Sequence, residues 1–297
     1  MTITMRQQMG LTIEELFEQD ERLALVLAEI STDFFRRLLR EHPQRALNLG
    51  ILEQTMISVA AGMAMEGFIP VVHSITPFLV ERPYEQIKDD FCYQRLGGNF
   101  ISTGGSYDYS TEGMTHHGPA DVPILRNLPG MQIVVPGTPR EFDRLFRAAY
   151  ANGAPTYFRL SVTSNPVEYP VTFGKLEVVK RGTQATVIAV GPALARVLPA
   201  VADLDVMVLY CTTVAPFDAG TLRAVSESDN IVLVEPYYEG ALVADVCAAM
   251  QHRRVRIETI GVPRVVLSHY GEPEQHDEAI GFTPRGIRQR IERFLYS

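Results

Sequence analysis

The sequence predicts an α/β protein made of two three-layer α/β/α domains, each with a mostly parallel sheet. Short runs of residues along the chain are almost continuously apolar, which is typical of strands buried on both faces of a parallel sheet. Longer stretches with helical periodicity separate these runs, and such strand–helix alternation indicates an α/β architecture. The expected strands cover residues 25–28, 70–75, 99–102, 132–135, 156–160, 185–190, 206–210, 230–234 and 256–260.

The helices expected between these strands include four well-marked ones. The start of the third is the clearest, because Thr138 can cap it and Pro139 suits its first turn. The four cover residues 32–41, 53–66, 139–152 and 241–251.

The alternation stops in a polar stretch that contains proline and glycine, residues 161–183, and restarts at TVIAVG. We therefore expect the domain boundary near residues 165–185. This divides the chain into a first domain over 1–165 and a second over 186–297.

Composition and charge narrow the functional class. The 297 residues include 27 Lys and Arg against 35 Asp and Glu, a formal net charge of −8, and no basic run interrupts the chain. This argues against nucleic acid or an anionic membrane as a partner. No stretch approaches the roughly 18 apolar residues of a membrane-spanning helix. The N-terminus lacks a signal-peptide pattern, and the three cysteines form no CxxC pair. We expect a cytoplasmic protein.

The most informative window is NLGILEQTMISVAAGMAMEGFIPVV, residues 48–72. An extended segment passes through Gly50 into a helix on which Glu53, Ile57 and Ala60 share one face. A buried carboxyl at this point could share a proton near neutral pH. Alternatively, Glu53 only stabilises the positive end of the helix through its first-turn amides. Spacing alone favours this second interpretation.

The string GILEQ followed by VAAGMAMEGFIPVV resembles the pyrimidine-binding domain of transketolases, deoxyxylulose phosphate synthases and the β subunits of 2-oxoacid dehydrogenase E1 components. The resemblance implies thiamine diphosphate as cofactor. It also implies that Glu53 binds the cofactor and acts in catalysis, by a hydrogen bond to N1′ of the aminopyrimidine. A proton held there favours the imino tautomer, whose nitrogen removes the C2 proton of the thiazolium ring.

The segment SITPFLVERPYEQIKDD resembles the family segment that places an aromatic ring against the pyrimidine. The resemblance implies Phe78 as the stacking, cofactor-binding residue, with Tyr84 as the alternate, because flat rings stack on heteroaromatic rings. Either ring could instead belong to the hydrophobic core.

The segment STEGMTHHGPADVPILRNLPGMQIVVP resembles the family loop that carries a histidine facing cofactor and substrate. That histidine is His116, which the resemblance makes a catalytic and substrate-binding residue, and His117 follows it as a further catalytic candidate. Histidines in a glycine-flanked loop are plausible proton donors and acceptors near pH 7. A metal site is the rival interpretation, but suitably spaced further ligands are missing.

Two positions depart from transketolases that act on sugar phosphates. Those enzymes have a histidine and an arginine where this chain has Gly105 and Val162. Arg159 lies near the second position and is our candidate substrate-binding residue. We expect a weak preference for phosphorylated acceptors.

The family's diphosphate-binding motif, GDG, does not occur in this sequence. The resemblance therefore implies a partner subunit that carries GDG and binds the diphosphate through Mg²⁺, in an α₂β₂ assembly. The expected function is that of the β-type subunit of a split transketolase-like enzyme. It would transfer a two-carbon ketol or acyl unit, via a thiamine-bound intermediate, to a small-molecule or carrier-bound substrate. The alternative is an E1-β-like subunit that passes an acyl group to a carrier. A third interpretation is a non-catalytic scaffold that kept the fold.

Overall fold

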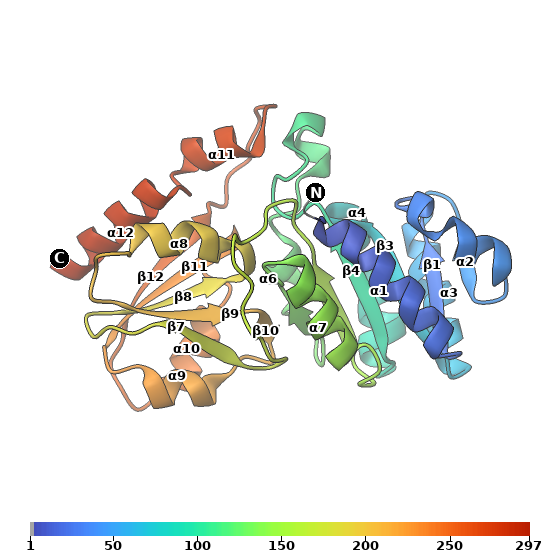
Figure 1. Cartoon of the computed structure of the whole chain (residues 1–297), viewed down its shortest axis with the longest axis horizontal. Helices are drawn as coiled ribbons and strands as arrows, with labels where there is room; N and C mark the ends of the chain where they lie inside the picture. Colours follow the sequence, from blue (N-terminus) through green and yellow to red (C-terminus); the bar gives the residue numbers. More distant parts are fainter. Residues whose placement is uncertain (1–2) are drawn as a thin grey trace.

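The computed structural model describes residues 3–297, which form two α/β lobes side by side (Figure 1). Each lobe has a sheet with helices on both faces, so the predicted fold class is confirmed. The strands are β1 (Leu23–Leu27), β2 (Ala46–Asn48), β3 (Ile69–Ile75), β4 (Gly98–Thr103), β5 (Gln132–Val134), β6 (Pro155–Arg159), β7 (Leu176–Lys180), β8 (Thr186–Val190), β9 (Met207–Cys211), β10 (Thr213–Ala215), β11 (Asn230–Tyr238) and β12 (Arg256–Val262).

The α-helices fill the outer layers of both lobes. They are α1 (Met5–Gln19), α2 (Arg36–Glu41), α3 (Glu53–Met65), α4 (Thr76–Val80), α5 (Tyr84–Gln86), α6 (Asp121–Leu125), α7 (Pro139–Ala149), α8 (Leu194–Ala200), α9 (Ala219–Val225), α10 (Val243–Ala249), α11 (Pro273–Ile280) and α12 (Pro284–Tyr296). Short 3₁₀ turns cover Thr32–Phe35, Ser110–Glu112, Met114–His116 and Gly191–Ala193, and Ile87–Tyr93 is π-helical.

The first sheet has the order β10-β5-β6-β4-β3-β1-β2, and all its pairs are parallel except β10 with β5. Alternate residues of β1 explain its two covered faces. Leu25 packs in the core with α1 and α7, whereas Val26 packs in the opposite core with α3. Helices on both sides leave only the strand ends open to ligands.

The second sheet has the order β12-β11-β8-β9-β7, parallel except for β7 with β9. Residues of α8 and α12 pack in one core with Val187 and Val232 of this sheet, and residues of α9 and α10 pack with Ile188 in the other. This lobe is therefore also three layers deep. No helix within residues 3–297 is long and apolar enough to cross a membrane.

All nine predicted strands are present, although several ends differ by a few residues. The prediction lacked β2, β7 and β10. Both β2 and β10 have three residues, too few for a pattern, and β7 lies inside the polar stretch that we expected to connect the domains. The structure also adds α1, α11 and α12, and it divides the helix expected over 32–41 into a 3₁₀ turn followed by α2.

The two lobes share structure at their junction. β10 comes from the second half of the chain but pairs with β5 at the edge of the first sheet. Nearby, Tyr210 of β9 donates a hydrogen bond to Oε2 of Glu141 in α7 at 2.7 Å, and Asn165 donates to Tyr210 Oη at 3.0 Å. Burial raises the pKa of the Glu141 carboxyl, and the bond from Tyr210 opposes that rise. One donor to Glu141 therefore comes from the other lobe, beside the amides of Gly137 and Tyr169.

Replacing Tyr210 with Phe should lower the free energy of unfolding by about 1–3 kcal/mol, because a buried carboxyl loses a donor while the packed ring remains. Urea denaturation measures the change. Tyr93→Phe is the matched control, since this side chain is 84% exposed, and it should change stability by less than about 0.5 kcal/mol. Equal stabilities of the two variants would contradict the assigned role of Tyr210.

Candidate active site

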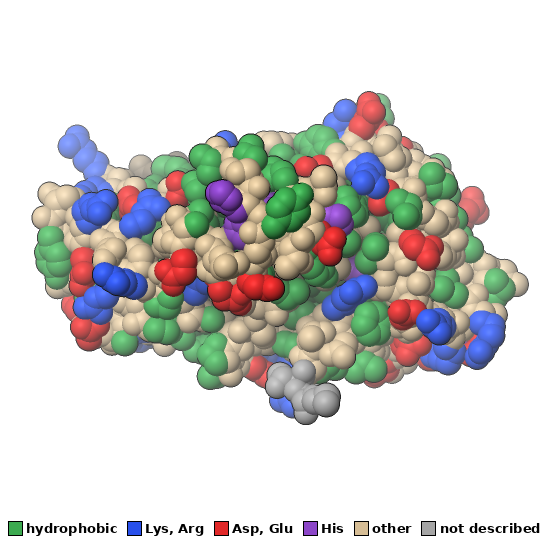
Figure 2. Space-filling model, turned by 90° about the horizontal axis from the view of Figure 1, so that it is seen from above, with side chains coloured by type: hydrophobic (Ala, Val, Ile, Leu, Met, Phe, Trp, Pro, Cys, Tyr) green, Lys and Arg blue, Asp and Glu red, His purple; other side chains and the backbone are tan. Residues whose placement is uncertain are grey.

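The predicted site residues follow the carboxyl ends of neighbouring strands in the first sheet. Glu53 comes after β2, Phe78 after β3, and the histidines after β4, while Arg159 is the last residue of β6. Ligands of open α/β sheets bind at this edge. Seen from above, the molecule shows histidine side chains near the centre of its upper face, next to hydrophobic groups (Figure 2). We refer to the segment Gly104–Gly118 as the histidine loop.

Glu53 begins α3 and is buried, with 1% of its surface exposed. Its Oε2 accepts a hydrogen bond from Arg82 Nη1 at 2.8 Å. Within residues 3–297 no group donates to the other oxygen, Oε1, and no first-turn amide bonds to the side chain. The structure therefore shows no bond between Glu53 and the first-turn amides of its helix, which the alternative interpretation required. A buried carboxylate with one unpaired oxygen can accept a further donor.

Arg82, which the sequence analysis did not single out, connects Glu53 to the aromatic residue. Its guanidinium carbon lies 4.4 Å from the centroid of the Phe78 ring. The edge of the His116 ring in turn meets Phe78, with centroids 5.1 Å apart. Arg82 thus links Glu53 to Phe78, and Phe78 in turn contacts His116.

Tyr84, the alternate stacking residue, and His116 differ in their surroundings. Tyr84 packs at the margin of the hydrophobic core, and its hydroxyl donates to the carbonyl of Ile124 at 3.3 Å. The structure therefore links Phe78, and not Tyr84, to the Glu53 group. The Nδ1 atom of His116 is bonded to Thr115 Oγ1 at 3.0 Å.

His117 points into the structure and is only 4% exposed. Its ring meets that of His276 from α11 edge to face, with centroids 5.5 Å apart. Burial lowers the pKa of His117, and the neighbouring His276 and His116 lower it further. The sequence analysis assigned no site residue to the second half of the chain and so missed His276.

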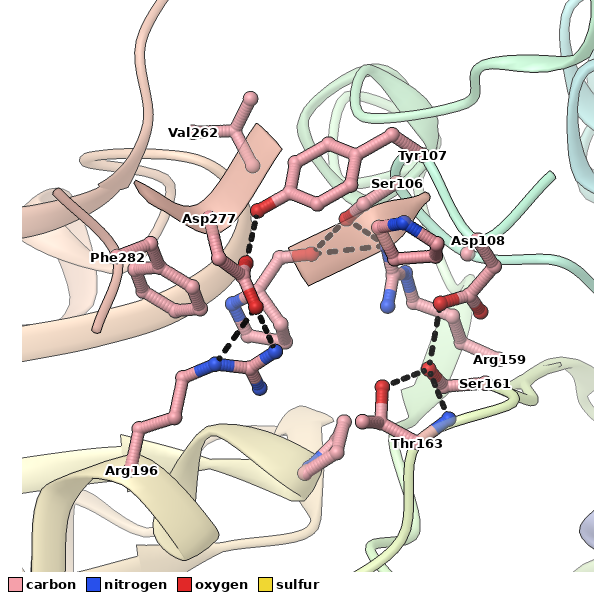
Figure 3. A pocket seen from close by; sticks show the side chains of 14 residues that line it. Ser106, Tyr107, Asp108, Arg159, Ser161, Thr163, Arg196, Val262, Asp277 and Phe282 are labelled. Atoms are coloured by element: carbon pink, nitrogen blue, oxygen red, sulfur yellow. Dashed lines mark hydrogen bonds and ion pairs between the residues drawn. The ribbon is translucent and has the colours of Figure 1, made fainter. Parts of the chain in front are cut away.

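Arg159 is enclosed at the junction of the lobes, with 1% of its surface exposed. Its Nε donates to Asp121 Oδ2 at 2.7 Å, and its Nη2 donates to Ser106 Oγ at 2.8 Å and to the carbonyl of Pro236 at 2.9 Å. Arg159, Ser106 and Pro236 are among the residues that line a cavity of about 30 Å³, enough for one or two water molecules (Figure 3). This geometry does not fit the substrate-binding role predicted for Arg159, because its charge is paired and its cavity is too small for a sugar.

The glycine at position 105 has a structural explanation. A Cβ atom there would lie 2.6 Å from Nη1 of Arg159, closer than any normal contact. A larger side chain at Gly105 would displace the buried guanidinium. Val162, at the second departing position, is 53% exposed.

Metal ligands are not gathered in the part of the chain that the structure describes. No group of three or more His, Cys, Asp or Glu residues there is arranged to hold a metal ion. The adjacent histidines have different surroundings, His116 near Phe78 and His117 against His276.

Comparisons with known proteins agree with this architecture. The family model described as "Transketolase, pyrimidine binding domain" matches residues 1–166, and the model "Transketolase, C-terminal domain" matches residues 174–287. A solved structure described as "split gene transketolase, inactive beta4 tetramer" has a TM-score of 0.86 and 24% identity. It covers 100% of this chain and 99% of its own.

Several curated proteins are similar in sequence. An uncharacterized 33.6 kDa protein in the fasciation locus of Rhodococcoides fascians is 38% identical over 96% of this chain and 93% of its own length. One subunit of the apulose-4-phosphate transketolase of Actinobacillus succinogenes is 28% identical, over 75% of this chain and 76% of that protein. A 1-deoxy-D-xylulose-5-phosphate synthase of Thermus thermophilus is 30% identical over 97% of this chain, which spans only about half (48%) of the synthase. The first family model covers more than half of the residues of this chain, so the chain belongs to the transketolase family.

Proposed function

We propose that this chain is the β-type subunit of a split, thiamine diphosphate-dependent transketolase-like enzyme that transfers a two-carbon unit. The observation that carries the proposal is the buried Glu53 carboxyl with its unpaired Oε1, beside Phe78 at the ligand-binding edge of the sheet. An oxygen of a buried carboxyl that has no partner among the described residues can accept a hydrogen bond from a ligand. A protonated ring nitrogen of an aminopyrimidine is such a donor.

The residues around Glu53 fit an aminopyrimidine. Glu53 would bind N1′ and hold the proton shared there, and Phe78 would offer an aromatic face. When bound, thiamine diphosphate supplies the carbon nucleophile that accepts a two-carbon unit from a donor. The chain's own task is to orient the ring and to hold that proton.

Arg82 holds Glu53 and Phe78 in position while Glu53 has no ligand. Its ion pair at 2.8 Å offsets the cost of burying the carboxylate, and its contact with Phe78 holds the ring beside Glu53. His116 is fixed through Nδ1 by Thr115, so its Nε2 is the atom that could exchange a proton with a substrate.

A partner subunit is the second part of the proposal. Two relatives are named as subunits of transketolases, including the 6-deoxy-6-sulfo-D-fructose transketolase subunit of a Clostridium strain, which is 30% identical. The chain corresponds to about half of the one-chain synthases. We infer that a GDG-bearing subunit binds the diphosphate and Mg²⁺, and that the two form an α₂β₂ enzyme.

The purified chain alone should bind thiamine diphosphate and Mg²⁺ negligibly, because it holds only the pyrimidine end of the cofactor. Adding the GDG-bearing subunit should restore binding. Isothermal titration calorimetry on the chain, on the partner and on the mixture measures this. Tight binding to the chain alone would sink the idea that the site is shared.

Replacing Glu53 with Gln should reduce turnover of the reconstituted enzyme by about 10² or more, the range of a lost acid–base contribution. The change is nearly isosteric, so assembly with the partner should survive, as size-exclusion chromatography would show. Exchange of the cofactor C2 hydrogen for deuterium, followed by NMR, should slow in parallel. Glu66→Gln, just after the end of the same helix and exposed, is the control. Near-normal exchange in the Glu53 variant would remove this residue from the proposed role.

The enzyme should show only a weak preference for phosphorylated acceptors. An arginine–phosphate hydrogen bond contributes about 1.5–3 kcal/mol, but Arg159 is enclosed with Asp121 and Arg82 is paired with Glu53. Steady-state kcat/KM values for matched phosphorylated and unphosphorylated aldehydes decide the point. Adding a phosphate should change kcat/KM by less than about 10². A preference above about 10³ would show that another cation binds the phosphate. Transfer to a lipoyl carrier in place of an aldehyde would favour the E1-β-like alternative.

A further inference from the structure

The second lobe reaches the histidine loop through α11 and the residues just before it. Ser110 Oγ of the loop donates to the carbonyl of Gly271 at 2.6 Å. Tyr107 Oη donates to Asp277 Oδ1 at 2.5 Å, and the ring of Tyr270 packs against Gly113, where it leaves no room for a Cβ. The loop that carries both candidate histidines is therefore held from the other lobe.

Asp277 is the fixed point of this contact. Its carboxylate pairs with Arg196 of α8 and accepts the hydroxyl of Tyr107, and Figure 3 shows all three side chains pointing toward one another. Asp277 is 6% exposed. An ion pair that is shielded from water resists displacement more than a surface pair does. The neighbouring residue on α11, His276, is thereby held in one place.

The His276 ring lies between Tyr107 and His117. Its centroid is 5.2 Å from that of Tyr107, at an interplanar angle of 31°, and 5.5 Å from that of His117, at 86°. Both histidines are 4% exposed, and the Nε2 atom of each is buried without a hydrogen-bond partner among the described residues. Unpaired buried nitrogens lower stability by about 1–3 kcal/mol each, so a purely structural role would be better filled by apolar rings.

Neither ring nitrogen of His117 is hydrogen-bonded within the described part of the chain, and of the two only Nε2 is among the fully buried unpaired atoms. Metal ligands and catalytic histidines are usually oriented by a hydrogen bond to their second nitrogen. For His117, the contact that the structure shows is instead with the ring of His276. Its other close titratable neighbour is His116 on the same loop.

We propose that His276, held by Asp277 and Tyr107, is a positioning residue that orients the His117 imidazole so that its Nδ1, the ring nitrogen that is not fully buried, can exchange a proton with the substrate. The reaction named here rests on the proposed function, but the orientation of His117 can be measured without it. His276 acts through another residue and touches neither cofactor nor substrate. The second lobe then takes part in forming the site.

The test compares His276→Ala with His276→Phe in the full chain. Alanine opens the contact to water, so the titration midpoint of His117 should rise toward the ordinary value of about 6.5, because burial is what lowers its pKa. Phenylalanine keeps a flat ring and should leave the midpoint low. NMR of histidine-labelled chain, without cofactor or partner, records this midpoint. His252→Phe, at an exposed histidine, is the control.

In the reconstituted enzyme, His276→Ala should lower kcat about tenfold with little change in KM. The acid limb of its pH–rate profile should move by the same amount as the NMR midpoint. Tyr107→Phe removes the hydrogen bond between Tyr107 and Asp277 but keeps the ring that packs on His276, so it should have a smaller effect in the same direction. If His276→Ala does not fold, His276→Asn, which is smaller and polar and also admits water beside His117, takes its place.

An unchanged His117 midpoint in the alanine or asparagine variant would overturn the proposal. So would equal losses of kcat in the alanine and phenylalanine variants with no shift of the acid limb, because that pattern marks a packing role. Failure of the proposed function would look different. The NMR midpoints would then move as expected while no variant, nor the native protein, transferred a two-carbon unit.

Discussion

The buried ion pair between Arg159 and Asp121 is the constraint on which the arrangement of the site depends. Both side chains are almost fully enclosed, and an isolated buried charge would cost several kcal/mol. The pair is kept only because every neighbour satisfies it. Ser106 of the histidine loop and the carbonyl of Pro236 in β11 accept from the guanidinium, and Tyr157 donates to the carboxylate. One charged pair therefore joins the first sheet, the histidine loop and the second lobe.

This pair explains why the histidine loop does not behave as an independent surface loop. The loop leaves β4 through Gly104 and Gly105, and the second glycine makes room for the guanidinium. Ser106 and Tyr107 then bond to groups of the second lobe, Pro236 and Asp277. A loop fixed at its start by a buried charge and at its side by α11 presents its histidines in one arrangement. Rigid support of this kind is what proton transfer needs.

The sequence predicts those parts of this structure that depend on local pattern. Long buried strands such as β8 and β11 are visible as apolar runs, and Thr138 caps α7 as expected. α1 was within reach of the same method, since its buried residues, Met5, Met9, Ile13 and Phe17, follow helical spacing. β10 could not be predicted in this way, because three residues are too few to show a periodic pattern and its pairing partner lies in the other half of the chain.

The site divides in the same way. Glu53, Phe78 and His116 were predicted through motifs, and motif residues are contiguous in sequence. The contacts that these residues make with other side chains are not visible in the motifs. Arg82, between α4 and α5, reaches Glu53 because α5 and the turn after it pack against α3, and His276 reaches His117 because the two lobes pack together. The role predicted for Arg159 does not fit for the same reason, since its enclosure by Asp121 and Pro236 appears only in three dimensions.

The surface beside Glu53 shows why such a site suits a shared enzyme. Ile51 and Leu52, the two residues before this buried carboxyl, are 69% and 54% exposed. Large apolar side chains flanking a buried charge are unusual on a surface that stays in water, and they are typical of surfaces that become covered. Covering them would also remove water from around Glu53, Arg82 and Phe78. Electrostatic interactions are stronger in a site without water, so the closing of this edge by a second protein would strengthen the hydrogen bond that Glu53 is placed to make.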